Sequence, residues 1–419
     1  FVRDATILDG RFAGSPWLQE LPDPITKLVW DNAALMSTTT AAKLDVENGD
    51  FIEITHHAQT LKMPVWVQPG VADEVVVLPL GYGLTDSGEF AKSGFSVAPL
   101  RSAESPWTLT GASAKKVAGR YDLACVQVET SLHDRPLIRE ATRKDFSEEP
   151  NFVDRFEAMD ESHMETLLWE EPNPTDGHQW AMTIDLNSCT GCGACTIACQ
   201  AENNIPWVGK EDCLNGREMH WIRVDRYFDQ QDRDVQVKVQ PLTCAHCETA
   251  PCENVCPVGA TVHSPEGMND MAYNRCIGTR YCANNCPYKV RRFNFFHYTV
   301  RNDEDYGMGI SMQRNPDVTV RYRGVMEKCT YCVQRVNRAR IDAKVNRDGV
   351  IRDGEVTTAC AQACPAEAIT FGNMNDPESR VAKKRADSRN YAVLSEINLG
   401  ARTTYLAKLS HPNPDLEEA

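Results

Sequence analysis

The cysteines constrain the fold of this chain more than any other feature. Fifteen of its 17 cysteines fall into four groups within residues 189–364. The first group has the spacing C-x2-C-x2-C-x3-C and consists of Cys189, Cys192, Cys195 and Cys199. Cysteines at this spacing on a tight loop direct several sulfurs toward one point, as they do in ferredoxins. The sequence therefore predicts loops that fold around metal–sulfur clusters, and strand signals at 181–186, 220–228 and 234–240 lie between the cysteine groups.

Three further groups follow the first, and each of them contains or ends in Cys-Pro. The second group is Cys244, Cys247, Cys252 and Cys256, and the third is Cys276, Cys282 and Cys286. The fourth is split by a 27-residue insertion and consists of Cys329, Cys332, Cys360 and Cys364. In the third group, Thr279 stands where the first group has a cysteine. Two cysteines lie outside the groups, and we expect Cys125 and Cys213 to be packed free thiols.

Structural zinc and disulfide bonds are the two alternatives to iron–sulfur clusters. Zinc ribbons use pairs of C-x2-C pairs rather than the spacing of the first group. Disulfides fit an even number of cysteines, but they serve small domains that lack a core, and such closely spaced cysteines pair poorly with one another. The fourfold repeat favours iron–sulfur clusters. In two-cluster ferredoxins the last cysteine of a group ligates the other cluster, so we expect the groups to exchange their last cysteines in pairs.

Residues 181–371 resemble the four-cluster, ferredoxin-type electron-transfer subunits of molybdopterin oxidoreductases, such as those of polysulfide and dimethyl sulfoxide reductases. In that family the first group pairs with the fourth, and the second pairs with the third. The resemblance implies a first ligand set of Cys189, Cys192, Cys195 and Cys364, and a second set of Cys329, Cys332, Cys360 and Cys199. It implies a third set of Cys244, Cys247, Cys252 and Cys286, and a fourth set of Cys276, Cys282 and Cys256.

In the fourth set, Thr279 stands where the fourth ligand would be. A cube that lacks one thiolate can lose the iron at that corner, and three cysteines suffice for a [3Fe-4S] cluster. The alternative is a [4Fe-4S] cluster with water or the Thr279 oxygen on its fourth iron, although hard oxygen is a weak partner for a site that prefers soft thiolate. The expected cofactors are therefore three [4Fe-4S] clusters and one [3Fe-4S] cluster.

Residues 1–115 contain the signals of an all-β domain and no cysteine. The stretch 50–70 is typical of two short strands with a polar connection, and 74–83 is a β-branched run that ends in a glycine turn. The phrase SPWLQELPDPITKLVWDN at 15–32 resembles the C-terminal barrel domain of molybdopterin oxidoreductase catalytic subunits. Because the chain opens at Phe1 inside what looks like a folded domain, we expect it to be the C-terminal part of a longer polypeptide.

The predicted fold class is α+β: an N-terminal β-barrel of the molybdopterin-oxidoreductase type, followed by a double ferredoxin-like four-cluster domain. The predicted parts are a barrel at 1–115, an acidic linker at 116–178, the four-cluster domain at 179–376, and a C-terminal helix with an extended tail at 377–419. Asp376 and Pro377 should open that helix as its N-cap and first residue. Residues 144–171 hold ten Asp/Glu and suit either a solvated linker or a docking segment.

The fusion of a barrel with a four-cluster domain resembles the B subunit of alternative complex III, as do the phrase HDRPLIREAT at 133–142 and the division into three four-cysteine sites and one three-cysteine site. The resemblance implies that the barrel holds no molybdopterin. In agreement, Leu84 follows the turn at 81–83, where pterin-binding relatives often have a basic or polar residue. The implied partners are an integral membrane quinol-binding subunit of polysulfide-reductase type and c-type haem subunits. The implied location is peripheral, on the periplasmic side of the bacterial inner membrane.

Charge and hydropathy limit the partners further. A net charge of -15 argues against nucleic acid, because phosphate binding needs a basic surface. No apolar run reaches the ~18 residues of a membrane span, so any membrane contact would come through partner subunits. Residues 275–340 are basic, with thirteen Lys/Arg against five Asp/Glu. These cations either stabilise nearby anionic clusters and raise their potentials, or form a solvated face.

Together these features predict an electron-transfer subunit of a membrane-attached, quinol-oxidising complex. In such a subunit the clusters supply the redox chemistry, and the protein supplies their placement and electrostatics. The sequence offers no nucleophile–base pair or acid–base dyad, so we expect no catalytic site in this chain. The alternative is the electron-transfer part of a molybdenum- or tungsten-dependent reductase whose active site lies in a preceding N-terminal half.

Overall fold

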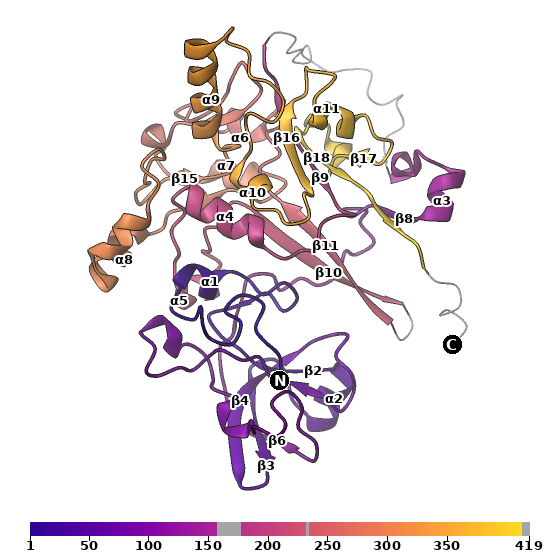
Figure 1. Cartoon of the computed structure of the whole chain (residues 1–419), viewed down its shortest axis with the longest axis vertical. Helices are drawn as coiled ribbons and strands as arrows, with labels where there is room; N and C mark the ends of the chain where they lie inside the picture. Colours follow the sequence, from indigo (N-terminus) through magenta and orange to yellow (C-terminus); the bar gives the residue numbers. More distant parts are fainter. Residues whose placement is uncertain (157–176, 232–233, 413–419) are drawn as a thin grey trace. The chain divides into compact units, whose positions relative to one another are not determined.

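The structure is a computed structural model that describes residues 1–156, 177–231 and 234–412 (Figure 1). The chain forms two compact units. Unit 1 consists of Phe1–Ser131, Trp207–Glu218 and Arg226–Lys238. Unit 2 consists of Leu132–Pro206, Met219–Asp225 and Val239–Ala419. Most of the acidic stretch at 144–171, and the tail from residue 413 onward, lie outside the described residues.

A five-stranded sheet forms the body of unit 1, with the strand order β5-β2-β4-β3-β6. Its strands are β2 (Ala34–Met36), β3 (Asp50–His56), β4 (Gln59–Val67), β5 (Val76–Val77) and β6 (Ser113–Arg120). The two strands predicted at 50–70 are confirmed as β3 and β4, which pair antiparallel. Buried Met36, Ile52 and Met63 pack in one apolar core with their neighbours. The outer strands of this sheet are β5 and β6, and they do not pair with each other to close a barrel. The barrel therefore stays a prediction.

Shorter elements complete unit 1: α1 (Pro16–Glu20), β1 (Leu28–Val29), α2 (Thr38–Leu44), β7 (Ala124–Cys125) and α5 (Lys210–Leu214). The segment 15–32 contains α1, and the last residue of α1, Glu20, has a buried carboxylate. Glu20 is 1% exposed, and its Oε2 accepts hydrogen bonds from the backbone N–H groups of Val208 and Gly209, both at 2.8 Å. These bonds join α1 to the start of α5. Burial outweighs them and raises the pKa of Glu20 to about 7.

Glu20 predicts that stability depends on pH. Its pKa rises from 4.5 to about 7 on folding, so the folded chain binds this proton more tightly than the unfolded chain does. The stabilisation is therefore complete below pH 4.5 and is lost as the pH rises through 7. A shift of this size corresponds to a loss of about 3 kcal/mol.

Denaturant unfolding between pH 5 and 8, followed by tryptophan fluorescence, measures this loss. At pH 5, Glu20→Gln should have the same free energy of unfolding as the parent chain. At pH 8, its free energy of unfolding should be higher than that of the parent chain. Glu47→Gln is the control, because Glu47 is an exposed acid of the same unit. The same fall with pH in Glu20→Gln as in the parent would contradict the assignment.

A four-stranded sheet organises unit 2, in the order β16-β9-β18-β17 (Figure 1). Its strands are β9 (Trp180–Asp185), β16 (Ile369–Asn373), β17 (Asn390–Tyr391) and β18 (Thr403–Leu406). The strand predicted at 181–186 is confirmed as β9, which pairs antiparallel with β16 and parallel with β18. The segment near the C-terminus thus supplies two strands of the sheet beside the cysteine groups.

The C-terminal helix begins later than the sequence predicts. Helix α11 spans Arg380–Arg385, and its N-cap is Ser379, whose Oγ accepts a hydrogen bond from Ala382 N at 3.2 Å. The Asp376 carboxylate instead accepts from Glu378 N, in the turn that contains Pro377. Ser379 is fully buried and also donates to Asn373 O at 2.7 Å, which ties the start of the helix to β16. This second bond favours Ser379 over Asp376 as the cap.

Further strands and helices complete the described part of the chain. The strands are β8 (Glu140–Thr142), β10 (Arg223–Gln231), β11 (Asp234–Leu242), β12 (Thr261–His263), β13 (Asn269–Met271), β14 (Arg292–Phe293), β15 (Met326–Glu327) and β19 (Lys408–Ser410). The helices are α3 (Arg143–Glu148), α4 (Ala194–Glu202), α6 (Pro251–Asn254), α7 (Tyr281–Asn285), α8 (Tyr298–Tyr306), α9 (Val333–Asn346) and α10 (Ala359–Gln362). The strands predicted at 220–228 and 234–240 are found as β10 and β11. Within the described ranges, no helix combines the length and apolar character that crossing a membrane needs.

Candidate iron–sulfur centres

Two pairs of short helices carry the four cysteine groups. Helix α4 begins within the first group and contacts α10, which belongs to the fourth group (Figure 1). Helix α6 of the second group contacts α7 of the third. Packing therefore brings the groups together in the same pairs that the family resemblance implies. The assignment of individual cysteines to individual clusters stays a prediction.

A cavity in unit 2 is lined by all four cysteines of the first set. Cys364 follows α10, yet its thiol lies close enough to affect Cys195 on α4. Burial, reinforced by Cys189, Cys192 and Cys364, raises the pKa of Cys195 to about 12. Thiolates here are therefore stable only beside a compensating positive charge, which a bound metal supplies. The donor set and its cavity fit an iron–sulfur cluster.

The second set gathers at the end of α4. Burial raises the pKa of Cys199, and three thiols from the fourth group raise it further: Cys329, Cys332 and Cys360. Asn203 lies one helical turn after Cys199, and its Nδ2 donates to Cys199 Sγ at 3.5 Å and to Cys332 Sγ at 3.9 Å. The sequence prediction missed this asparagine, although the i, i+4 spacing on an expected helix was a usable signal.

The third set combines the first three cysteines of the second group with the last cysteine of the third group. Burial raises the pKa of Cys247, and three neighbouring thiols raise it further: Cys244, Cys252 and Cys286. All four cysteines are buried. Cys286 ends α7, and Cys252 lies on α6, so the contact between these helices brings the set together.

The fourth set combines the last cysteine of the second group with the first two cysteines of the third group, which lie on or beside the same pair of helices. Burial would raise the pKa of Cys256, but the backbone N–H groups of the following residues lower it, and Ala260 N donates to Cys256 Sγ at 3.1 Å. Cys282 is buried on α7 and Cys276 is partly buried. Thr279 is exposed in the loop between them. Its loop packs closely at Gly278, where a Cβ would lie 2.5 Å from Gly324 O.

The two ungrouped cysteines are free thiols, as predicted. Cys213 is 2% exposed on α5, and burial raises its pKa well above the usual range. Cys125 is partly buried and donates to Gln127 O at 3.1 Å. Both belong to unit 1, whereas the grouped cysteines all belong to unit 2.

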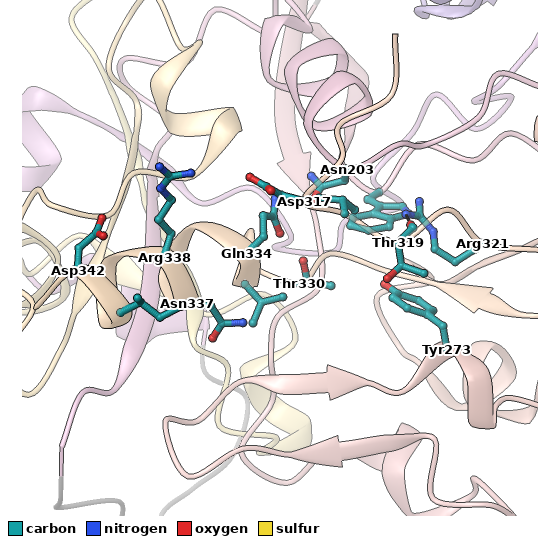
Figure 2. Close-up of a pocket in the computed structure, with 14 residues that line it drawn as sticks. Asn203, Tyr273, Asp317, Thr319, Arg321, Thr330, Gln334, Asn337, Arg338 and Asp342 are labelled. Atoms are coloured by element: carbon teal, nitrogen blue, oxygen red, sulfur yellow. Dashed lines mark hydrogen bonds between the residues drawn. The ribbon is translucent and has the colours of Figure 1, made fainter. Parts of the chain in front are cut away.

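A cavity of about 530 Å³ lies beside the second set (Figure 2). Asn203 and Thr330 form the part of its lining that is adjacent to cysteines of this set. Arg321 lines it as well, but its charge is paired with Glu327 at 2.9 Å. Arg338 and Asp342 of α9 line the other side (Figure 2). This cavity has no signature in the sequence, because its lining comes from segments far apart in the chain.

Comparison with known proteins supports the binding of iron–sulfur clusters. Two models of the 4Fe-4S dicluster domain match residues 188–260 and 235–302. The chain is 40% identical over 239 residues to the menaquinone reductase iron-sulfur cluster-binding subunit of Nitratidesulfovibrio vulgaris, and the match covers 55% of this chain and 89% of that protein. The chain belongs to the family of iron–sulfur cluster-binding subunits of reductase complexes. Like its relatives, it is an electron-transfer subunit.

Two further members of the family match the same fraction of the chain. The Hdr-like menaquinol oxidoreductase iron-sulfur subunit 1 of Archaeoglobus fulgidus is 33% identical over 56% of this chain and 85% of its own length. A putative iron-sulfur subunit of dimethyl sulfoxide reductase from Halobacterium salinarum is 32% identical over 54% of this chain and 78% of its own length.

The ligand sets predict which cysteines act together. Cys364→Ser and Cys189→Ser should weaken the electron paramagnetic resonance signal of one and the same cluster, because both thiols line one cavity. Cys360→Ser is the matched control, since Cys360 lies four residues earlier on the same short segment but belongs to the second set. It should instead affect the cluster that Cys199→Ser affects. Loss of the same signal in Cys364→Ser and Cys360→Ser would contradict the sets.

Proposed function

We propose that this chain relays electrons in a quinol-oxidising complex of the alternative complex III type, through three [4Fe-4S] clusters and one [3Fe-4S] cluster. The observation that carries the proposal is the division of fifteen cysteines into sets of four, four, four and three, on helices that pack in the matching pairs. When bound, the clusters supply one-electron chemistry, and the chain supplies thiolates, backbone N–H donors and counter-charges.

The thiols also suggest the order of the clusters. Cys195 of the first set contributes to the raised pKa of Cys360 in the second set. Cys244 of the third set contributes likewise to the raised pKa of Cys329 in the second. Helix α6 of the second group contacts α7 of the third group, which supports a position of the fourth set next to the third. The proposed order is therefore first, second, third, fourth, in one line.

We propose that the fourth set lies nearest the quinol-oxidising membrane subunit, which would be of the polysulfide-reductase type. In related reductases the half that contains the second and third groups faces the membrane anchor. Two apolar side chains next to cysteines of this set are exposed, as suits a docking surface: Ile277 at 65% and Tyr281 at 53%. Electrons would leave from the first set toward c-type haem subunits, on the periplasmic side of the inner membrane.

We also propose that unit 1 is a barrel of the molybdopterin-oxidoreductase type that holds no pterin. Leu84 packs against a small buried core that includes Ile7 and Tyr82. The Tyr82 hydroxyl donates to Asp4 Oδ2 at 3.1 Å. The turn at 81–83 is thus engaged by contacts within unit 1.

The second candidate is the electron-transfer part of a molybdenum- or tungsten-dependent reductase, which the match to a putative dimethyl sulfoxide reductase subunit favours. Metal analysis of the full-length protein separates the two candidates. We expect about fifteen iron atoms per chain, as three four-iron clusters and one three-iron cluster require, and no stoichiometric molybdenum or tungsten. Stoichiometric molybdenum would refute the first candidate. About sixteen iron atoms, without a three-iron signal in the oxidised protein, would refute the [3Fe-4S] site.

Thr279→Cys tests the fourth set directly. A fourth thiolate should convert the three-iron cluster to [4Fe-4S], lower its potential and slow quinol oxidation, because the added thiolate makes the site more negative. Thr279→Ser is the control and should keep the three-iron signal and the parent rate. Unchanged turnover in Thr279→Cys, with the conversion and the lower potential both verified, would show that electrons do not depend on this cluster.

A further inference from the structure

Arg291 is a buried cation whose guanidinium touches a cysteine of the third set. It is 7% exposed, and its Nη2 donates to Cys252 Sγ at 3.2 Å and to Asn269 Oδ1 at 3.1 Å. Its Nη1 donates to Thr261 Oγ1 at 3.1 Å. Thr261 lies on β12 and Asn269 on β13, so this hairpin holds the guanidinium in a fixed orientation.

The structure gives Arg291 no carboxylate partner among the residues that it describes. The other buried arginines of unit 2 near the cysteines differ in this respect: Arg321 pairs with Glu327, and Arg402 pairs with Glu248. A buried cation without an anion is strongly destabilising. The anion that compensates Arg291 must therefore come from the thiolates around it.

Those thiolates belong to two ligand sets. Burial alone would lower the pKa of Arg291, but Cys252, Cys282, Cys244 and Cys286 raise it. Cys282 is a member of the fourth set, and the other three are members of the third. The guanidinium thus lies at the junction of these two sets.

A second buried cation lies near the third set. Lys328 is fully buried, and its Nζ donates to Cys329 O at 2.8 Å. Its charge acts on Cys252 of the third set and on Cys329 of the second set. It also acts on the partly buried Asp270, which lies beyond ion-pair distance within the described part of unit 2.

We propose that Arg291 raises the reduction potentials of the clusters in the third and fourth sets, and that Lys328 raises those of the third and second sets. The inference rests on the ligand sets of the proposed function. An electron added to a cluster makes it more negative, so a fixed cation beside its sulfurs stabilises the reduced form. The third set receives both cations, and removing either one shifts its cluster.

The hydrogen bond to sulfur and the positive charge are separable contributions. A guanidinium fork reaches Thr261, Asn269 and Cys252 at the same time, whereas a lysine carries the charge on one shorter-reaching nitrogen. Arg291→Lys should therefore keep most of the rise in reduction potential that the cation causes, and Arg291→Gln should remove that rise. A purely structural role would be disturbed by both substitutions.

The test is a redox titration of the full chain with its clusters assembled, monitored by electron paramagnetic resonance. In Arg291→Gln, the ratio of reduced to oxidised third-set cluster at a fixed potential should fall at least tenfold, which is about 59 mV for one electron. The three-iron signal should shift in the same direction. In Lys328→Gln, a four-iron signal should shift and the three-iron signal should stay in place. Arg275→Gln is the control: Arg275 is exposed and precedes Cys276, so solvent screens its charge.

Parent potentials in Arg291→Gln with all clusters present, or equal shifts in Arg291→Lys and Arg291→Gln, would overturn the inference. If the clusters do not assemble in Arg291→Gln, Lys328→Gln provides the test. Unchanged potentials in Lys328→Gln overturn the inference, and the selective shift supports it. Iron content and the three-iron signal of the parent chain are measured first. An iron content well away from about fifteen atoms per chain, or the absence of the three-iron signal, refutes the cluster count. Intact clusters with unchanged potentials refute only the role of the cations.

Discussion

Unit 2 depends on the compensation of buried thiolate charge. Burial raises the pKa of cysteines in the first three sets, and it raises that of Cys195 and Cys360 to about 12. Bare thiolates at these positions would be costly, so each set needs positive charge from metal, from backbone N–H groups or from side-chain cations. The structure shows the protein's share: the N–H of Ala260 at Cys256, the amide of Asn203 at Cys199, and the guanidinium of Arg291 at Cys252.

Three of the helices around the cysteines are short. Helices α6, α7 and α10 have four or five residues each, and each carries or adjoins cysteines of two different sets. Helix α10 also donates to a sulfur of the second set, from Ala359 N to Cys332 Sγ at 3.4 Å. The sheet formed by β16, β9, β18 and β17 then holds the first and fourth groups from one side, since β16 follows Cys364 and β9 precedes Cys189.

Local patterns allowed the sequence to predict the cysteine groups and the strands β3, β4 and β9. The start of α11 was predicted wrongly, because Asp376 and Ser379 are both good caps and a bond to Asn373 in β16 decides between them. Strands β18 and β19 were not predicted, since they pair with β9 and β8 far away in sequence. Arg291 could be recognised only as one basic residue among many, because its acceptors lie 22 to 39 residues before it.

An anomalous difference map at the iron absorption edge, from crystals of the full chain, tests the central claim most directly. The account predicts four iron–sulfur clusters in one line. Three of them are each bonded by four cysteines, and the last is bonded by Cys256, Cys276 and Cys282, with no iron beside Thr279. Fewer than four clusters, a fourth iron atom bonded at Thr279 in the last cluster, or a zinc signal at any of the four sets would contradict it.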